Sequence, residues 1–413
     1  MKQVLRCLSS GKRLLKPGGD SKQLGRFSNN LSAGVVGLAN VGKSTFFQAI
    51  TKSQLGNPAN YPFATIEPCE ALVTVPSAKL DHLARLYGSG KTVPTTLKIH
   101  DIAGLVRNAS SGAGLGNKFL NDIRQVDGIF QIVRGFVDDE IVHVENNLVD
   151  PLRDLMIVGD ELILKDLEFV ESGLELKQKD LKRPHIDKIK LQLELDTLNK
   201  LLDTLYEGRK ISSGEWDDEE IDIINSYNFL TAKPSVYLLN VSESEYVSGK
   251  NQYKEKVQLW INENCPGDQL LMFLAAFESK YNELESSPKE LAEYLSGFEG
   301  QGPNTCSALP TIVESMREAL NLISFYTCGP KEAHQWTTRN GWTAPKAAGV
   351  IHTDFEKSFI SAQVYKYSDL QTLEPPFDEA SLKSKGKQYR QGKNYIVEDG
   401  DVLLIKAVGG KAR

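Results

Sequence analysis

Residues 37–44 carry a pattern that suits the binding of a triphosphate. The stretch reads GLANVGKS, in which two glycines flank four residues and are followed by Lys43 and Ser44. In such a loop, backbone N–H groups turn towards phosphate oxygens, and the next helix adds partial positive charge at its N-terminus. Lys43 would reach the β- and γ-phosphates, and the Ser44 hydroxyl would bind Mg²⁺. The pattern predicts a nucleoside triphosphate site rather than a chance glycine turn. The predicted nucleotide-binding residues here are Asn40, Val41, Gly42, Lys43, Ser44 and Thr45.

A second motif, DIAG, begins at Asp101 and directly follows a strand-like stretch at 95–100. GTPase-class proteins use this arrangement to place a carboxylate behind Mg²⁺ and a glycine N–H near the γ-phosphate. We therefore expect Asp101 to hold the metal through a water molecule and Gly104 to sense the γ-phosphate. Thr65, in a proline-rich loop, is the candidate for a second hydroxyl on Mg²⁺; the alternative is a hydroxyl that faces water.

The residue after this motif bears on the rate of hydrolysis. Ras-like enzymes have there a glutamine that orients the attacking water, but this chain has Leu105, which offers neither donor nor acceptor. We expect slow turnover, on the order of 10⁻⁴ to 10⁻² s⁻¹ without assistance. His143 is one polar group that could substitute, or it could be structural. The predicted catalytic residues are Lys43, His143 and Gly104.

The choice of base should depend on Asn240-Val241-Ser242-Glu243, which follows an apolar stretch. GTPases place Asn-Lys-x-Asp there, and the aspartate accepts two hydrogen bonds from guanine. Here valine replaces the lysine, and Glu243 is one methylene longer than aspartate, so its carboxylate should be out of register for guanine. Phe277 likewise replaces the usual lysine of a second base-contacting loop. We predict that Asn240, Val241 and Glu243 contact the base, and that the site accepts adenine.

The surrounding pattern predicts the elements that position these residues. Short apolar stretches are separated by helix-length connections, which is typical of a mostly parallel sheet with helices on both faces. The predicted strands are 33–36, 70–76, 95–100, 129–133, 235–241 and 270–276. A helix should begin at about residue 44, directly after the phosphate loop.

Two further parts have a different texture. Apolar residues at heptad spacing predict two antiparallel helices with a coiled-coil-like contact within 151–229. Their seams are Ile163, Leu167, Val170 and Leu174, and then Leu191, Leu195, Leu198, Leu202 and Leu205. Near the C-terminus, 394–397 and 402–406 flank a turn-like EDGD stretch and predict a hairpin. The predicted domains are a leader at 1–30, a nucleotide-binding domain at 31–150 and 230–305, the helical insert at 151–229, and a small domain at 323–408.

Charge is unevenly distributed along the chain. Residues 1–30 contain seven Lys or Arg and one acid and so carry a charge of +6. Because the net charge of the chain is −6, the other residues together carry −12. A basic, acid-poor, serine-bearing leader is typical of a mitochondrial presequence; the alternative is a basic arm on a cytoplasmic protein. No stretch is apolar for long enough to span a membrane, so we expect no membrane insertion. The five scattered cysteines, without a Cys-x-x-Cys pair, argue against a zinc site.

Together these motifs resemble one family, the YchF-type Obg-like ATPases within the translation-factor class of P-loop NTPases. The resemblance covers nearly the whole chain from about residue 32. It rests on GLANVGKST, NYPFATIEP, DIAGLV, NVSE, AAGVIHTDFEKSFI and GKNYIVEDGDV, in this order. It implies an α/β fold, with a Ras-like P-loop NTPase domain, a coiled-coil helical insert and a C-terminal TGS (β-grasp) domain. Ala39 departs from the proline that the family usually has there, and the basic leader is a second departure.

The resemblance also implies a function. Family members bind ATP at least as well as GTP through an Asn-x-x-Glu motif, matched by Asn240 and Glu243, and carry a histidine matching His143 that is proposed to serve hydrolysis. Asn40 matches an asparagine associated with K⁺ in related enzymes. We therefore expect an ATP-hydrolysing, Mg²⁺-dependent switch that associates with ribosomes and regulates translation or stress response. The alternatives are a GTPase of the same class and a scaffold that holds nucleotide with negligible hydrolysis.

A basic run in the C-terminal domain is a candidate for local contact with ribosomal RNA. It comprises Lys383, Lys385, Lys387, Arg390 and Lys393. Such a run could bind RNA phosphates or could equally be a solvated loop. We expect the chain to be a monomer.

Overall fold

The computed structural model describes residues 22–26, 28, 30–52, 65–67, 70–102, 115–138, 149–181, 187–298 and 306–408, with side chains omitted at 65–67 and 115–119. The chain forms two compact units. The first comprises 1–26, 32–71 and 99–316, and the second comprises 27–31, 72–98 and 317–413. Within the described residues, no helix is long and apolar enough to cross a membrane.

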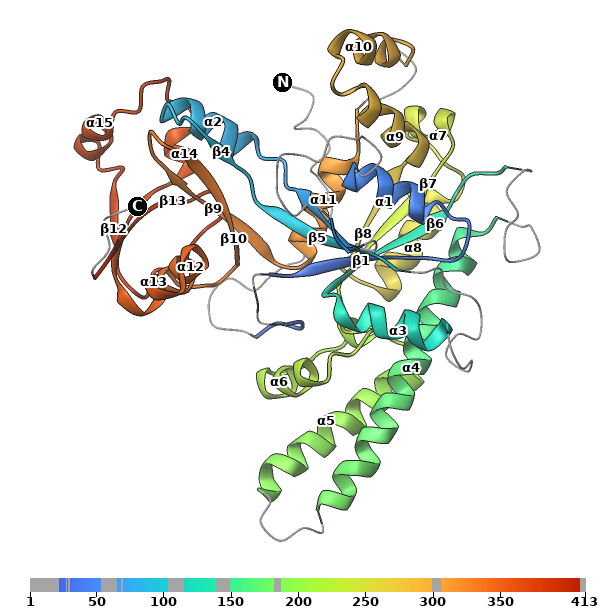
Figure 1. Ribbon diagram of the computed structural model, residues 1–413. Coiled ribbons are helices and arrows are strands. Elements are labelled where there is room, and N and C mark those ends of the chain that lie inside the picture. The colour runs from blue at the N-terminus through green and yellow to red at the C-terminus, as the bar shows by residue number, and fades with distance from the viewer. Residues whose placement is uncertain are drawn as a thin grey trace. The chain divides into compact units, whose positions relative to one another are not determined.

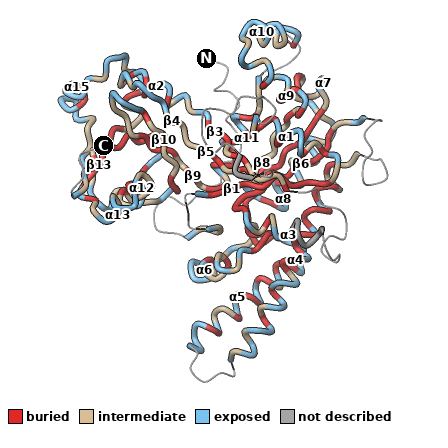
Figure 2. The backbone as a smooth tube through the Cα atoms, in the orientation of Figure 1, coloured by how far each residue is buried: buried red, intermediate tan, exposed pale blue. Residues whose placement is uncertain are grey.

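A seven-stranded sheet forms the centre of the first unit (Figure 1). Its strand order is β2-β3-β5-β1-β6-β7-β8, and the pairs β1–β6, β6–β7 and β7–β8 are parallel. The bounds are β1 Ser32–Val36, β2 Thr65–Glu67, β3 Glu70–Thr74, β5 Thr96–Asp101, β6 Gly128–Arg134, β7 Ser235–Asn240 and β8 Gln269–Phe273. Every residue of β1, β6 and β7 is buried (Figure 2), as expected for parallel strands covered on both faces. These strands confirm the predicted α/β pattern.

The helices of this unit connect the strands or extend beyond them. They are α1 Lys43–Thr51, α3 Leu115–Gln125, α4 Pro151–Asp180, α5 Lys188–Tyr206, α6 Asp218–Tyr227, α7 Glu243–Ser248, α8 Lys254–Asn264, α9 Ala275–Leu284, α10 Pro288–Ser296 and α11 Leu309–Ala319. The predicted strand 270–276 is shorter than expected, because β8 ends at Phe273 and helix α9 already begins at Ala275.

Helices α4 and α5 form the predicted antiparallel hairpin, which projects from the sheet (Figure 1). Its apolar core contains Ile163, Val170 and Leu174 from α4, and Leu191, Leu195, Leu198 and Leu205 from α5, with Leu167 and Leu202 partly buried against them. Asp150 caps α4 by accepting hydrogen bonds from the N–H groups of Leu152 and Arg153, and Asp187 caps α5 in the same way. The heptad pattern therefore identified the packing face of both helices.

At the base of the hairpin, a buried carboxylate ties α4 to the chain that enters β7. The Asp166 carboxylate accepts hydrogen bonds from the N–H groups of Leu230 (3.0 Å) and Thr231 (2.8 Å) and from the Thr231 hydroxyl (2.8 Å). Burial raises its pKa, and these three donors oppose the rise. The insert is thus hydrogen-bonded to the edge at which β7 begins.

The second unit contains a six-stranded sheet with the order β12-β11-β13-β9-β10-β4. Its strands are β4 Thr92–Val93, β9 Leu322–Cys328, β10 Ala333–Arg339, β11 Phe359–Tyr365, β12 Tyr389–Gln391 and β13 Val402–Ala407, and its helices are α2 Ala78–Leu86, α12 Ala344–Ile351, α13 Thr353–Ser358, α14 Tyr367–Leu370 and α15 Glu379–Ser384. Apolar residues of α2 pack with Tyr326 and Tyr365 in one core cluster.

The predicted hairpin of 394–397 with 402–406 is wrong. Strand β13 pairs with β11 and β9, while Ile396 makes only an isolated bridge to Thr343. The Asp401 carboxylate explains this, because it accepts hydrogen bonds from the Tyr395 hydroxyl (2.6 Å) and the Glu398 N–H (3.0 Å). These bonds close the chain into a loop and leave β13 free to lie inside the sheet.

Candidate functional site

The loop at residues 37–44 connects β1 to α1 and approaches its neighbours closely at both glycines. A Cβ atom at Gly37 would lie 2.4 Å from the Ile132 carbonyl oxygen of β6. At Gly42, where φ is +99°, a Cβ would lie 2.4 Å from the Asn240 amide nitrogen. Both positions therefore require glycine, and at Gly42 the backbone conformation adds to the steric reason.

Lys43 lies at the start of α1 and is almost fully buried. Its ammonium donates a hydrogen bond to the Leu38 carbonyl oxygen at 2.5 Å. Burial lowers the pKa of Lys43 to about 8, and the charge of Asp101 partly opposes this effect. Burial likewise raises the pKa of Asp101, and Lys43 opposes that rise. Each charge is thus poorly solvated, and a polyanion beside Lys43 would raise its pKa again.

The other polar groups of the loop are accessible to a ligand. Asn40, Ser44 and Thr45 are exposed, and Asn40 adopts a left-handed conformation with φ of 62°. The Val41 side chain is fully buried, so this residue could contact a ligand only through its backbone. An exposed hydroxyl at Ser44 and a half-buried carboxylate at Asp101, which ends β5, are oxygen donors of the kind that Mg²⁺ prefers.

Asn240, the last residue of β7, joins the phosphate loop to helix α9. Its side chain, 3% exposed, donates to the Val41 carbonyl oxygen at 3.1 Å and accepts from the Ala275 N–H at 3.2 Å. The backbone carbonyl of Asn240 accepts from the Gly135 N–H at 2.7 Å. One amide side chain therefore couples the loop that suits phosphates to the predicted base-contacting segments.

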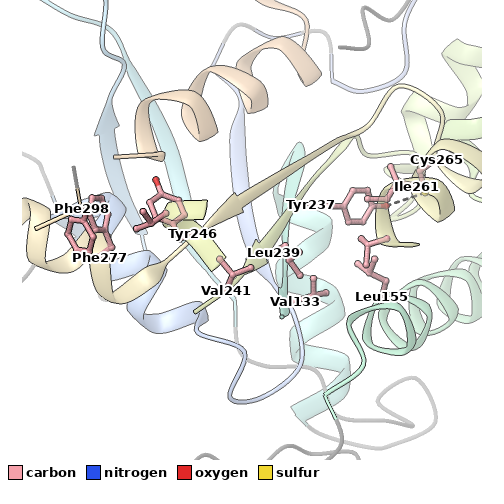
Figure 3. Close-up of a cluster of buried hydrophobic side chains, with 12 residues drawn as sticks. Val133, Leu155, Tyr237, Leu239, Val241, Tyr246, Ile261, Cys265, Phe277 and Phe298 are labelled. Carbon is pink, nitrogen blue, oxygen red and sulfur yellow. Dashed lines mark hydrogen bonds between the residues drawn. The ribbon is translucent and has the colours of Figure 1, made fainter. Parts of the chain in front are cut away.

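The two residues after Asn240 that were predicted to contact the base have different environments. Val241 is fully buried in the apolar cluster of Figure 3, so its side chain cannot reach a base. Glu243 is the first residue of α7 and is exposed. Phe277 is also buried in this cluster, with its ring 5.3 Å from that of Tyr246. Both Val241 and Phe277 are therefore core residues.

Three predictions fall outside the described residues. Gly104, Leu105 and His143 lie there, as does most of the glycine-rich stretch 109–117. For Thr65, the structure describes only the backbone, which lies in β2. The structure therefore brings together Asn40 to Thr45, Asp101 and Asn240, and leaves the positions of the others as predictions.

A network that sequence reasoning missed holds the segment after Asn240. The Glu245 carboxylate accepts from the Ser242 N–H (3.1 Å), the Ser242 hydroxyl (2.7 Å) and the Asn251 side chain (2.8 Å). Asn251 also donates to the Gly135 carbonyl at 3.0 Å. The Ser-x-x-Glu capping pattern at 242–245 was a readable signal for the first two bonds, whereas the partners of Asn251 depend on the fold.

A second missed feature is a buried carboxylate in α9. Glu278 is fully buried, and it accepts from the Ser307 hydroxyl at 2.5 Å and the Ala308 N–H at 2.7 Å. Burial raises the pKa of Glu278 to about 7, although both donors oppose this. Nearby, the Asn282 side chain donates to the Ala49 carbonyl at 2.5 Å and so fixes α9 against α1.

Comparisons with known proteins identify the family. A family model described as "50S ribosome-binding GTPase" matches residues 32–160, and the YchF-GTPase_C model, described as a protein of unknown function (DUF933), matches residues 322–408. An "Obg-like ATPase homolog" of Saccharomyces cerevisiae is 52% identical over 402 residues, which cover 96% of this chain and 99% of that protein. The chain belongs to the Obg-like ATPase family. Obg-like ATPase 1 of Schizosaccharomyces pombe is 47% identical over 392 residues, covering 93% of this chain and 96% of the relative.

Solved structures agree with this family assignment. The YchF GTPase of Schizosaccharomyces pombe has a TM-score of 0.81 to this chain at 46% identity, covering 93% of this chain and 100% of the other. A GTP binding protein from Pyrococcus horikoshii, 18% identical with a TM-score of 0.53, shares the fold. The predicted architecture of a P-loop NTPase domain, helical insert and C-terminal TGS domain is confirmed, and the chain is an Obg-like ATPase, as the sequence predicted.

Proposed function

We propose that this Obg-like ATPase is a molecular switch that binds and hydrolyses ATP and acts on the ribosome. The observation that carries the proposal is the buried Lys43 ammonium, facing Asp101, at the start of a helix whose phosphate loop exposes Ser44 and Thr45. Lys43 would neutralise the β- and γ-phosphates, and the N–H groups of residues 40–45 would bind their oxygens.

We assign the metal site to Ser44, Thr65 and Asp101, with Asp101 acting through a water molecule. When bound there, Mg²⁺ would neutralise charge on the β- and γ-phosphate oxygens. The half-buried Asp101 fits this role because a nearby cation would stabilise its carboxylate form, which burial disfavours. Asn40, exposed at the tip of the loop, is the residue to test for an effect of K⁺. Gly104 would sense the γ-phosphate, and His143 would assist hydrolysis in place of the missing glutamine at Leu105.

ATP is favoured over GTP by the residues around Asn240. The GTPase lysines are replaced by Val241 and Phe277, both buried in the core, and Glu243 starts α7 with a longer side chain than aspartate. Titration calorimetry with ATP and GTP tests the choice, with Glu243→Asp as the matched variant that restores the GTPase carboxylate. If wild-type protein binds GTP more tightly than ATP, the chain is a GTPase of the same class and the assignment of the base is wrong.

Leu105 favours a second candidate function, a scaffold that holds nucleotide without useful hydrolysis, because leucine cannot orient the attacking water. Single-turnover hydrolysis of ATP, with and without ribosomes, separates the two functions. The switch predicts slow intrinsic turnover that ribosomes accelerate and that Lys43→Ala abolishes. Turnover that is undetectable in both conditions, together with tight ATP binding, would support the scaffold.

The ribosome is proposed as partner because the model that matches residues 32–160 is named for ribosome-binding GTPases. In the C-terminal domain, Lys383, Lys385, Arg390 and Lys393 are exposed around α15 and β12, whereas Lys387 pairs with Asp369 at 2.6 Å. Replacing the four exposed cations by glutamine should weaken nucleotide-dependent co-sedimentation with ribosomes if they contact RNA phosphates. Unchanged co-sedimentation would make this run a solvated surface.

We further propose that the basic leader directs the chain to mitochondria and that the chain acts as a monomer. Fractionation of cells that express the full chain tests the first statement, with a cytoplasmic location as the alternative. Light scattering of the purified protein tests the second. Neither result changes the assignment of the nucleotide site.

A further inference from the structure

Residues 22–26 belong to the predicted leader, yet they are bound along helix α6. The Lys22 N–H donates to the Asp218 carboxylate at 3.1 Å, and its ammonium pairs with Asp222. The Gly25 N–H donates to the Asn225 side-chain oxygen at 2.7 Å, and the Asn225 amide donates to the Gln23 carbonyl at 2.9 Å. Figure 1 shows this short blue segment beside α6. Leu24, between these bonds, packs against the core of the helical insert.

The last residue of this segment makes a stronger contact with the sheet. Arg26 donates to both oxygens of the Asp127 carboxylate, from Nε at 2.6 Å and from a terminal nitrogen at 2.6 Å. Asp127 is 6% exposed and also accepts from the Ser32 N–H at 2.9 Å, at the start of β1. A planar guanidinium that binds a buried carboxylate through two bonds is among the strong charge-assisted pairs in proteins.

The surroundings make Arg26 difficult to remove. Lys233 lies near the same carboxylate, and burial lowers the pKa of Lys233 to about 8. The charges of Asp127 and Asp166 oppose this lowering, and those of Arg26 and Arg124 add to it. Without Arg26, the buried Asp127 would lose the cation that binds both of its oxygens. The Arg26 side chain is 47% exposed, but its loss would be destabilising because the Asp127 charge would remain buried.

We propose that residues 22–26 are a permanent part of the folded enzyme, an N-terminal clasp that joins the helical insert to the sheet, and that proteolytic removal of the leader occurs on the N-terminal side of Lys22. The clasp stands on these contacts alone, whereas the position of cleavage also rests on the proposed mitochondrial location. The cleavage is hydrolysis by a processing peptidase, in which one water is consumed and a new carboxylate and a new α-amino group form.

The charge distribution is compatible with this boundary. Residues 1–21 contain Lys2, Arg6, Lys12, Arg13 and Lys16 against Asp20. That part alone is therefore basic and acid-poor, as a presequence requires. Lys22 and Arg26 are not needed for that basic character, and both pair with carboxylates of the first unit.

The first experiment measures the clasp in the full chain. Arg26→Gln should lower the midpoint of thermal unfolding by roughly 3–6 °C, because the two-pronged pair is lost. Lys12→Gln is the matched control and should leave it unchanged. Asp127→Asn added to Arg26→Gln should recover part of the loss, since the buried charge is then gone. Truncation to Lys22 should keep the wild-type midpoint, and truncation to Ser28 should lower it. Equal midpoints for wild type, Arg26→Gln and the Ser28 truncation would refute the clasp.

The second experiment locates the cleavage. The full chain with a C-terminal tag is purified from a mitochondrial fraction, and its N-terminus is determined by sequencing and intact mass. A new N-terminus at or before Lys22 is expected, and one at any residue after Lys22 would overturn the boundary. A protein found only in the cytoplasm with its leader intact would refute the mitochondrial location and the cleavage together, while the clasp would still be decided by the unfolding midpoints.

Discussion

Replacing Asn240 by alanine removes the side chain that joins the phosphate loop to α9. The substitution leaves two buried backbone groups without their partner, the Val41 carbonyl and the Ala275 N–H. A buried polar group that loses its hydrogen bond costs about 1–3 kcal/mol, so the loss of two partners should destabilise the variant by about 2–6 kcal/mol. Part of that cost should appear as disorder of the phosphate loop, because Asn240 also lies against Gly42.

The consequence for ligand binding distinguishes two roles for Asn240. If it supports the phosphate loop, its loss should weaken binding of ATP, GTP and inorganic tripolyphosphate alike, by about tenfold or more, since 1.4 kcal/mol corresponds to a factor of ten. If it only contacts the base, tripolyphosphate should bind the variant as it binds the wild type. The structure favours the first role, because both hydrogen bonds of the side chain go to backbone groups of the protein.

Titration calorimetry with the three ligands, alongside chemical denaturation, measures both effects. Asn262→Ala removes an asparagine from the exposed surface of α8 and serves as the matched control, with no expected change in affinity. Loss of ATP binding with unchanged tripolyphosphate binding would refute the proposed support of the loop. An unchanged free energy of unfolding would refute the hydrogen-bond argument itself.

Four further outcomes are expected. Gly42→Ala should abolish ATP binding, because at this positive φ its Cβ would lie 2.4 Å from the Asn240 amide nitrogen. Gly208→Ala is the matched control: φ is also positive there, but the space around its Cβ is open, so ATP binding measured by calorimetry should be unchanged. The pKa of Lys43 is about 8 in the folded protein and 10.5 in the unfolded chain, so the unfolded chain binds more protons between these two pH values. The contribution of Lys43 to the free energy of unfolding should therefore rise with pH in this range, and Lys43→Met should remove that pH dependence from denaturation curves. The pKa of Glu278 is raised from 4.5 to about 7, so the folded state binds more protons between these pH values and stability should fall as pH rises from 4.5 to 7. Glu278→Gln should make this fall less steep. A slope equal to that of the wild type would contradict the assignment. Leu198→Ala, in the fully buried seam of the helical hairpin, should lower the free energy of unfolding by about 2–5 kcal/mol without changing the affinity for ATP. A parallel loss of affinity would mean that the hairpin and the nucleotide site unfold together.

Local patterns in the sequence predicted the framework of the site well. The phosphate loop, the strand before it and the helix after it follow from glycine spacing and from apolar runs that are buried on both faces. The seam of the helical hairpin follows from heptad spacing, because a helix that buries one face repeats its apolar residues at that interval. Such signals need only a few neighbouring residues, and they were correct here.

Contacts between distant residues could not be predicted in this way. The predicted contact of Asn240 with a base stays a prediction, but the hydrogen bond from its side chain to Val41, 199 residues earlier, was not predicted; it forms because β1 and β7 both lie beside β6 in the sheet. The side chain of Val241, predicted to contact the base, lies in the core, and the predicted hairpin of 394–397 with 402–406 is a closed loop followed by a strand that pairs with β11 and β9. For Asn240 and for β13, the partner is set by the order of the strands, which no local pattern records.

The sequence by itself determined that this chain has a P-loop and a helical insert, because each depends on residue types at short, fixed spacing. Only the tertiary structure decided that Arg26, in a stretch that reads as leader, binds the buried Asp127, and that α2, in the segment 72–98, packs in the core of the C-terminal sheet. The physical reason is that a buried charge or an apolar helix face is satisfied by whatever group the fold brings next to it, and that group can come from any part of the chain.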